Sequence, residues 1–163
     1  MSEVALATAP LTAPPVIRAL LAKLAIPYTE VTEHAGLNPA QKVQAVLLED
    51  AVGALMVLFP QSQLLDLNRL AELTGRRLTA VSPDRIERML AKHDLSLLPG
   101  LPVLTSSPCL YEGSLLSEPS LLVHSGEAGL LLEIASIDFK TMLTKASAGH
   151  FGEPLSNIRP NLD

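Results

Sequence analysis

Two apolar runs joined by a short polar link lie near the middle of the chain. Val43–Leu48 and Ala54–Phe59 consist mainly of Val, Leu, Met, Ala and Phe, and the link between them contains Asp50 and Gly53. Asp and Gly favour turns, so this pattern predicts an antiparallel β-hairpin. Because both runs are nearly continuous in apolar residues, we expect the two strands to lie centrally in a sheet that is covered on both faces.

Two polar residues, Lys42 and Gln44, stand at the entrance to the first apolar run. Residues two apart in a strand point to the same face of a sheet. One interpretation is that a pocket lies on that face and uses both side chains. The alternative is that the two residues mark a frayed strand start at the surface.

A helix and a strand are predicted before the hairpin. Val16–Leu24 has apolar residues at helical spacing and follows Pro14 and Pro15, and proline is common in the first turn of a helix. Tyr28–Thr32 alternates as a half-buried strand does, and His34–Ala40 is expected to form a loop.

Two further helices follow the hairpin. Asp66 is suited to cap the first, and Gly75 to end it. After a short strand at Leu78–Val81, Ser82 is followed by Pro83, which is the pattern of a cap and a first helical residue.

The remainder of the chain combines loops, strands and a last helix. Expected there are an apolar loop at Leu95–Pro102, a strand at Val103–Thr105, a hairpin of Leu121–His124 and Leu130–Ile134 around the turn Ser125–Gly129, and a helix capped by Ser136. Helices and strands mix without strict βαβ repetition. The pattern therefore indicates an α+β fold with a mixed sheet.

The length of 163 residues fits one domain with a single core. Residues 1–13 are rich in Ala and Pro and are expected to form a flexible arm, and residues 146–163 to form a loosely attached tail. The domain itself is expected to cover residues 14–145.

Composition excludes several classes of function. The net charge is -5 and aromatic residues make up 3% of the chain, which argues against strong independent binding to RNA or DNA. One cysteine cannot form an internal disulfide, and four scattered histidines offer no metal-ligand spacing, so we expect no metal. No apolar run reaches transmembrane length, and a cytoplasmic protein without membrane contact is expected.

The order of motifs along the chain resembles the YbaK/ProX family, which also occurs inserted in some prolyl-tRNA synthetases. The resemblance covers roughly Val16 to Thr144. It is carried by AIPYTEV, LNPAQKVQAVLL, LLDLNRLAELTG, VSPDRIERM, PVLTS and the turn in HSGEAGLLLEI.

The resemblance implies an aminoacyl-tRNA deacylase, which removes a wrong amino acid from the tRNA 3′ end by hydrolysing its ester. It implies a mixed, partly barrel-like sheet flanked by helices, and no cofactor. In this family a strand lysine holds the substrate near the 3′ adenosine. A Gly-x-x-x-Pro loop offers backbone groups to the scissile carbonyl and to water, which is stabilisation of the oxyanion type.

The chain departs from the family pattern at several positions. Gln44 stands where the resemblance places the lysine, and Leu95 stands where it places the glycine four residues before Pro99. A helix of the family has no counterpart between Val31 and Leu37. His34 lies near a family histidine, although an exposed loop histidine is the better interpretation.

We expect the site to be one concavity lined by Gln44, the loop Leu95–Gly100 and the turn Ser125–Gly129. Lys42 either reaches the place of the missing lysine or is a solvated lysine at the strand entrance. The candidate site residues are Gln44 and Lys42 for catalysis, and Leu95, Pro99, Gly100, Ser125, Gly126, Gly129 and His34 for substrate binding.

Three functional hypotheses remain open. The chain is an aminoacyl-tRNA editing domain with an altered, weakened site, a catalytically degenerate domain that binds a ligand or regulates, or an interaction module of a larger assembly. Because the charge is negative, we expect weak binding to the aminoacyl-tRNA 3′ end alone and delivery of substrate by a partner such as an aminoacyl-tRNA synthetase.

Overall fold

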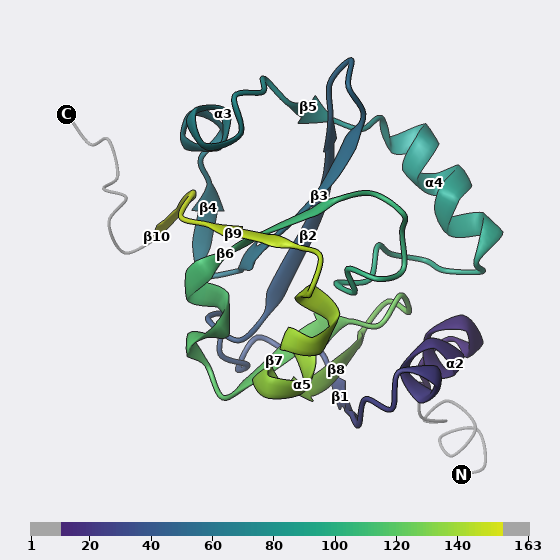
Figure 1. The fold of residues 1–163 in the computed structure, drawn as a ribbon. Coiled ribbons are helices and arrows are strands. Elements are labelled where there is room, and N and C mark those ends of the chain that lie inside the picture. The colour runs from purple at the N-terminus through teal and green to yellow at the C-terminus, as the bar shows by residue number, and fades with distance from the viewer. Residues whose placement is uncertain (1–10, 155–163) are drawn as a thin grey trace, which may run out of the picture.

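The structure, a computed structural model, describes residues 11–154. It is an α+β fold in which the sheets occupy the centre and the helices the periphery, as predicted (Figure 1). The sheets do not close into a barrel. They have the strand orders β5-β2-β3-β6-β9, β1-β8-β7 and β10-β4. Within residues 11–154, no helix has the length and apolar character needed to cross a membrane.

The elements have the following bounds. The helices are α2 (Pro15–Lys23), α3 (Leu67–Thr74), α4 (Pro83–Lys92) and α5 (Ser136–Lys140), with the 3-10 helices η1 (Gly113–Ser117) and η2 (Thr141–Leu143). The strands are β1 (Thr29–Thr32), β2 (Val43–Glu49), β3 (Ala54–Pro60), β4 (Gln63–Leu65), β5 (Thr79–Ala80), β6 (Cys109–Glu112), β7 (Ser120–His124), β8 (Leu130–Ala135), β9 (Ser147–Gly149) and β10 (Gly152–Pro154).

The predicted central hairpin is confirmed. Strands β2 and β3 pair antiparallel along their whole length, from Val43 opposite Pro60 to Glu49 opposite Ala54. On its other side β3 pairs in parallel with β6, so it is an inner strand. The outer edge of β2 is covered by β5 only at Leu48 and Glu49. Most of that edge therefore has no neighbouring strand in this sheet.

Apolar side chains pack on both faces of the five-stranded sheet, which explains the unbroken apolar runs. On one face Val43 and Leu47 join a large cluster with helix α2 and strands β7 and β8. On the other face Leu48 joins a smaller cluster with Leu70 of α3 and Phe151. The same strand supplies side chains to both clusters.

The expected caps of α3 and α4 are confirmed. The Asp66 carboxylate accepts bonds from the backbone at the start of α3, and Ser82 does so at the start of α4. The expected cap at Ser136 is wrong, because this residue is the first of α5 and its hydroxyl donates to the Glu118 carbonyl instead. The predicted strand at Val103–Thr105 is also wrong: these residues form turns and bends.

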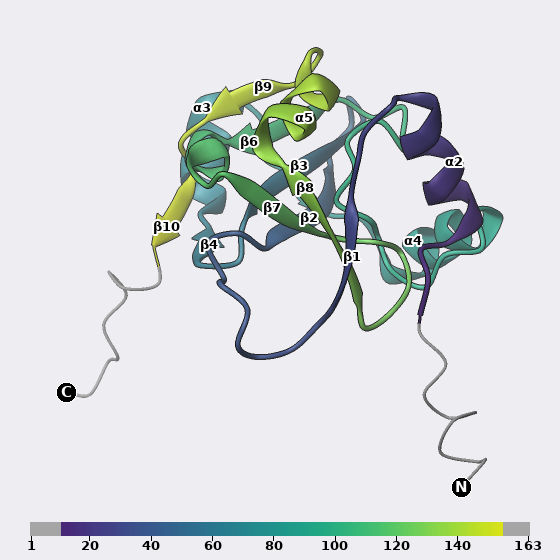
Figure 2. The ribbon, with the colours of Figure 1, turned by 90° about the horizontal axis from the view of Figure 1, so that it is seen from below.

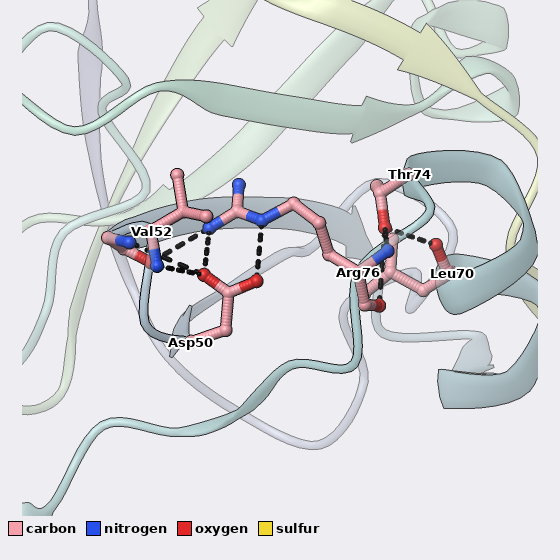
Figure 3. A network of polar contacts seen from close by, with 6 residues as sticks. Asp50, Val52, Leu70, Thr74 and Arg76 are labelled. Atoms are coloured by element: carbon pink, nitrogen blue, oxygen red, sulfur yellow. Dashed lines mark hydrogen bonds and ion pairs between the residues drawn. The ribbon is translucent and has the colours of Figure 1, made fainter.

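The turn between β2 and β3 is held to the end of α3 by an arginine. Arg76 donates to both carboxylate oxygens of Asp50, at 2.9 and 2.7 Å, and to the Gly53 carbonyl (Figure 3). The same carboxylate accepts the backbone N–H of Val52. The hydrogen bond from Arg76 is the main cause that lowers the pKa of Asp50 far below its usual range. This contact fixes the hairpin against α3.

Residues 147–154 belong to the fold, whereas their composition predicted a loose tail. Strands β9 and β10 pair with β6 and β4, and the side chain of Phe151 is 0% exposed. The buried Glu112 carboxylate accepts the backbone N–H groups of Phe151 and Gly152, both at 2.8 Å. Long-range partners therefore compensate for weak local signals, and residue 145 is too early a boundary. Residues 155–163 of the expected tail, and 1–10 of the expected arm, lie outside the described residues.

The connection between β1 and β2 is a wide loop without a helix (Figure 2). The backbone of Gln41 and Lys42 then joins β7, through a bond from the Leu122 N–H to the Gln41 carbonyl at 2.8 Å and a parallel bridge between Lys42 and Leu122. The loop thus brings the start of β2 to the three-stranded sheet. This junction positions the site described next.

Candidate functional site

The loop Leu95–Gly100 and the turn Ser125–Gly129 lie against each other. The backbone N–H groups of Ser96 and Leu97 donate to the Gly126 carbonyl at 2.8 and 3.3 Å, and the N–H of Gly100 donates to the His124 carbonyl at 3.4 Å. The structure therefore brings together two of the three segments that the sequence assigns to a site. These three N–H groups hold the loop to the turn, and a bound carbonyl would have to compete for them.

Leu95 fills the space above Gly126. Gly126 has φ +95°, and a Cβ built on it would lie 2.6 Å from Leu95 Cδ2 and 3.4 Å from Pro99 Cγ. The left-handed φ favours glycine here, and a larger residue would have to displace the Leu95 side chain. A glycine in place of Leu95 would leave this space beside the turn open.

The hydroxyl of Ser125 is used within the turn. It donates to the Leu130 carbonyl at 2.8 Å and accepts the Glu127 N–H at 3.1 Å, and the residue is 0% exposed. Gly129 has φ +83° and its carbonyl accepts the N–H of Glu33. Ser125 therefore acts as a structural residue of the turn, and its hydroxyl is turned inward.

Lys42 is buried and forms an ion pair. Its side chain is 9% exposed, and its Nζ lies 2.9 Å from Oε2 of Glu33, whose side chain is 31% exposed. The expectation of a solvated lysine at the strand entrance is therefore wrong. The hydrogen bond from Lys42 is the main cause that lowers the pKa of Glu33, although burial opposes the shift.

His124 lies at the end of β7 close to this pair. Burial lowers the pKa of His124, the Glu33 carboxylate opposes the shift, and the Lys42 ammonium adds to it. Its Nδ1 is buried and has no hydrogen-bond partner among residues 11–154. A neutral imidazole with an unused nitrogen can accept a proton or a hydrogen bond.

Gln44 is half-buried in β2, opposite Phe59 of β3. It is Val43 that approaches the loop: a Cβ built on Gly100 would lie 3.4 Å from Val43 Cγ1. Neighbouring strand residues point to opposite faces, so the Gln44 side chain points away from that contact. The loop and the turn contact each other, but the Gln44 side chain is not directed toward either of them.

His34 is exposed in the loop between β1 and β2, as the alternative interpretation expected. Its Nδ1 accepts the backbone N–H of Gly36 at 3.1 Å, which is a local turn contact. Within residues 11–154, no group of three or more His, Cys, Asp or Glu side chains is placed to hold a metal ion.

An apolar groove of about 390 Å³ runs along the open edge of β2. It touches β2, the end of β4, the start of α3, β5, α4 and the loop Leu95–Gly100. The lining residues are all apolar: Ala45, Val46, Leu47, Leu48, Leu65, Leu67, Ala80, Val81, Ile86 and Leu98.

Glu33, His124 and this groove were missed by the sequence analysis. The sequence does not reveal the surroundings of His124, because Glu33 and Lys42 come from other segments of the chain. Glu33 carries no signal either, since its pairing with Lys42 depends on the course of the loop between them. The groove is assembled from residues that lie far apart in the sequence, so no single stretch of sequence shows it.

Comparisons with known proteins place the chain in a family. The model of the aminoacyl-tRNA editing domain family matches residues 27–142, which is well over half of the chain. A comparison with curated proteins found no match.

The similar solved structures include two that differ in the share of their own chain that is matched. One is a protein from Marinobacter aquaeolei VT8 with the name "putative signal transduction protein": it has 27% identity and a TM-score of 0.81, over 91% of this chain and 33% of that chain. This chain therefore spans about a third of that protein. The other has the name "putative trans-editing enzyme for prolyl tRNA synthetase", with 20% identity and a TM-score of 0.68, over 87% of this chain and 99% of that chain. At that identity the second similarity shows a shared fold. The family match shows that the chain belongs to the aminoacyl-tRNA editing domain family.

Proposed function

We propose that the domain binds the aminoacylated 3′ end of tRNA and hydrolyses the ester slowly, as an editing domain with a weakened site. The observation that carries the proposal is the ion pair of Lys42. It is the lysine nearest to the family position occupied by Gln44, and its charge is already paired with Glu33 at 2.9 Å. No free lysine charge is offered to the substrate at this point of β2.

The loss of the charge slows the chemistry. Gln44 can donate a hydrogen bond, but it carries no charge to stabilise a developing oxyanion or a phosphate. In a site from which water is largely excluded, one lost electrostatic contact costs about 10²–10³ in rate. Because the Gln44 side chain points away from the loop, a lysine restored at this position gains activity only where its longer side chain reaches the ester.

The loop adds a second obstacle. Leu95 covers Gly126, and the N–H groups of Ser96 and Leu97 already donate to the Gly126 carbonyl. Backbone donors act on a carbonyl only when they point at it without a partner of their own. Hydrolysis through this loop requires it to move away from the turn, which lowers the rate further.

Substrate delivery depends on a partner. The chain carries a net charge of -5, which disfavours tight binding of the tRNA phosphates. An aminoacyl-tRNA synthetase that holds the mischarged tRNA would supply the missing affinity. The activity would then be exercised where tRNA is charged, in the cytoplasm.

A second candidate is a non-catalytic ligand-binding or regulatory module of a larger assembly. It is favoured by the similarity to the Marinobacter protein, which carries a name from signal transduction and of which this chain spans about a third. The paired Lys42 and the covered Gly126 also suit a domain that binds without hydrolysing.

A panel of misacylated tRNAs separates the two candidates. Each tRNA is incubated with an excess of the protein, and the loss of its amino acid is compared with the loss in buffer. The proposed deacylase accelerates hydrolysis of at least one member of the panel, and matched, correctly charged tRNA stays intact. If no member is hydrolysed faster than in buffer, the deacylase proposal fails and the binding module is the better account.

A further inference from the structure

A pocket of about 550 Å³ lies where the chain enters two neighbouring strands, β6 and β9. These strands run parallel and side by side, so the segments that precede them meet at the same end of the sheet (Figure 1). Residues of the segment 102–109 form one wall of the pocket, and residues of the segment 142–146 form the other. None of the lining residues belongs to the candidate site or to the apolar groove along β2. The pocket is therefore a separate feature of the molecule.

A second pocket, of about 430 Å³, adjoins the first. Both pockets are lined by Thr105, Ser106 and Ser107, so these three consecutive hydroxyl residues are reached from two sides. The rest of the second lining comes from the end of α4, from residues that follow it and from Leu104. The segment 105–107 therefore forms a ridge between the two pockets.

The charged side chains that line the two pockets are basic. Lys145 lines the first pocket, and Lys92 and His93 line the second. Neither lining contains an Asp or a Glu, although the chain as a whole has 17 acidic and 12 basic side chains. Within residues 11–154, neither lysine forms an ion pair with a carboxylate. A concave surface of one charge sign concentrates ligands of the opposite sign, so an anion is favoured here.

Hydrogen-bond donors of the segment 105–107 lack partners in the protein. Oγ1 of Thr105 is buried and has no hydrogen-bond partner within residues 11–154. In the same part of the chain, the backbone N–H groups of Thr105, Ser106 and Ser107 donate to no backbone carbonyl. A buried hydroxyl without a partner is unfavourable, and successive N–H groups that are free can bind an anion. A ligand with several acceptor oxygens would supply the missing partners.

We propose that the segment 105–107 and Lys145 bind the phosphate group of a small phosphate monoester in the larger pocket. The oxygens of a phosphate accept several hydrogen bonds at once, which suits the hydroxyl and N–H donors and the ammonium. Val103 and Met142 line the same pocket and offer apolar contacts to the organic part of the molecule. The volume of the pocket lies within the range of small-ligand sites. This binding does not depend on the proposed deacylation.

The first test compares three ligands by NMR titration of the isotope-labelled protein. Phenyl phosphate carries a phosphate and an apolar ring, phenol lacks the phosphate, and inorganic phosphate lacks the ring. We expect phenyl phosphate to shift the amide signals of residues 105–107 and of Lys145 in a saturable way. Inorganic phosphate should shift the same signals with weaker affinity, and phenol should not shift them.

Three variants locate the binding. Lys145→Met removes the ammonium at an exposed position and should weaken the binding of phenyl phosphate by about tenfold or more. Thr105→Val replaces the unpaired hydroxyl with a methyl group, so it should weaken binding without lowering the free energy of unfolding. The control Lys140→Met makes the same change of charge on α5, outside both pockets, and should leave binding unchanged.

Three results would overturn the proposal. One is the absence of saturable shifts at residues 105–107 with phenyl phosphate. Another is an equal loss of affinity in Lys145→Met and Lys140→Met, because the ligand would then respond only to the overall charge of the protein. The third is binding of uncharged tRNA that Lys145→Met weakens while phenyl phosphate does not bind, because the basic side chains would then serve a nucleic acid.

Discussion

The two partners of the ion pair between Lys42 and Glu33 are unequally buried, which predicts unequal effects of removing them. The Lys42 side chain is 9% exposed and the Glu33 side chain 31%. Without the Glu33 charge, an ammonium remains in a place that water barely reaches. Without Lys42, a carboxylate remains that water can still solvate.

The magnitudes follow from this difference. Loss of one partner of a fully buried pair costs about 3–5 kcal/mol, and an exposed pair contributes at most about 1 kcal/mol. Glu33→Gln keeps a neutral acceptor, so we expect it to lower the free energy of unfolding by about 1–3 kcal/mol, below the fully buried case. Lys42→Met fills the same space with an apolar chain and should cost at most about 1 kcal/mol.

Urea unfolding at pH 7 measures both values, and the double variant completes the cycle. Glu33→Gln/Lys42→Met should be more stable than Glu33→Gln, because it no longer buries an unpaired ammonium. Because the pKa of Glu33 is lowered in the folded state, its carboxylate stabilises the fold at pH values above the unfolded pKa of 4.5. This stabilisation is lost as the pH falls through the folded pKa. The difference between wild type and Glu33→Gln should therefore shrink below pH 4.5. A larger cost for Lys42→Met than for Glu33→Gln would refute this account of the pair.

Two further predictions concern the C-terminal strands and His124. Phe151→Ala should lower the free energy of unfolding by about 3–5 kcal/mol, because it empties a fully buried site. The control Ser147→Ala, at an exposed position of β9, should change this free energy by less than about 0.5 kcal/mol. Equal effects of the two substitutions would show that residues 147–154 do not pack as described. Lys42→Met should raise the pKa of His124 in an NMR titration, because the ammonium lowers it. An unchanged His124 pKa in Lys42→Met would contradict the proximity of the imidazole and the Lys42 ammonium. Since burial holds the pKa of His124 below 6.5, lowering the pH through that value should destabilise the wild type.

Local sequence signals sufficed for much of the fold. The central hairpin was predictable from its apolar runs, and the starts of α3 and α4 from Asp66 and Ser82. Each of these features depends on residues within a few positions of one another. The apolar content of β2 on both faces also indicated correctly that helices or further strands cover both sides of the sheet.

Features that depend on distant partners were not predictable. The composition of residues 147–154 is typical of a tail, and only the structure shows that Glu112 accepts backbone N–H groups of this segment. In the sequence Lys42 resembles a surface lysine, and only the course of the loop before β2 shows that Glu33 pairs with it. The contact between the loop Leu95–Gly100 and the turn Ser125–Gly129 was expected from the family resemblance. The direction of the Gln44 side chain depends on where the regular strand begins, which the sequence does not show.

The weakening of the site by Gln44 and Leu95 is the central claim. Single-turnover deacylation of a misacylated tRNA tests it most directly, with wild type, Lys42→Met, Gln44→Lys and Gln44→Lys/Leu95→Gly compared at the same pH and salt. Circular dichroism of each variant serves as the control for folding. The tRNA is the member of the panel on which the wild type is fastest.

We expect slow hydrolysis by the wild type and little change in Lys42→Met, whose ammonium is held by Glu33. Gln44→Lys should raise the rate, by up to about 10²–10³ if the new charge reaches the ester, and Leu95→Gly should raise it further by uncovering Gly126. Fast hydrolysis by the wild type that survives Lys42→Met, with no gain in Gln44→Lys, would contradict the account, because the chemistry would then need no lysine.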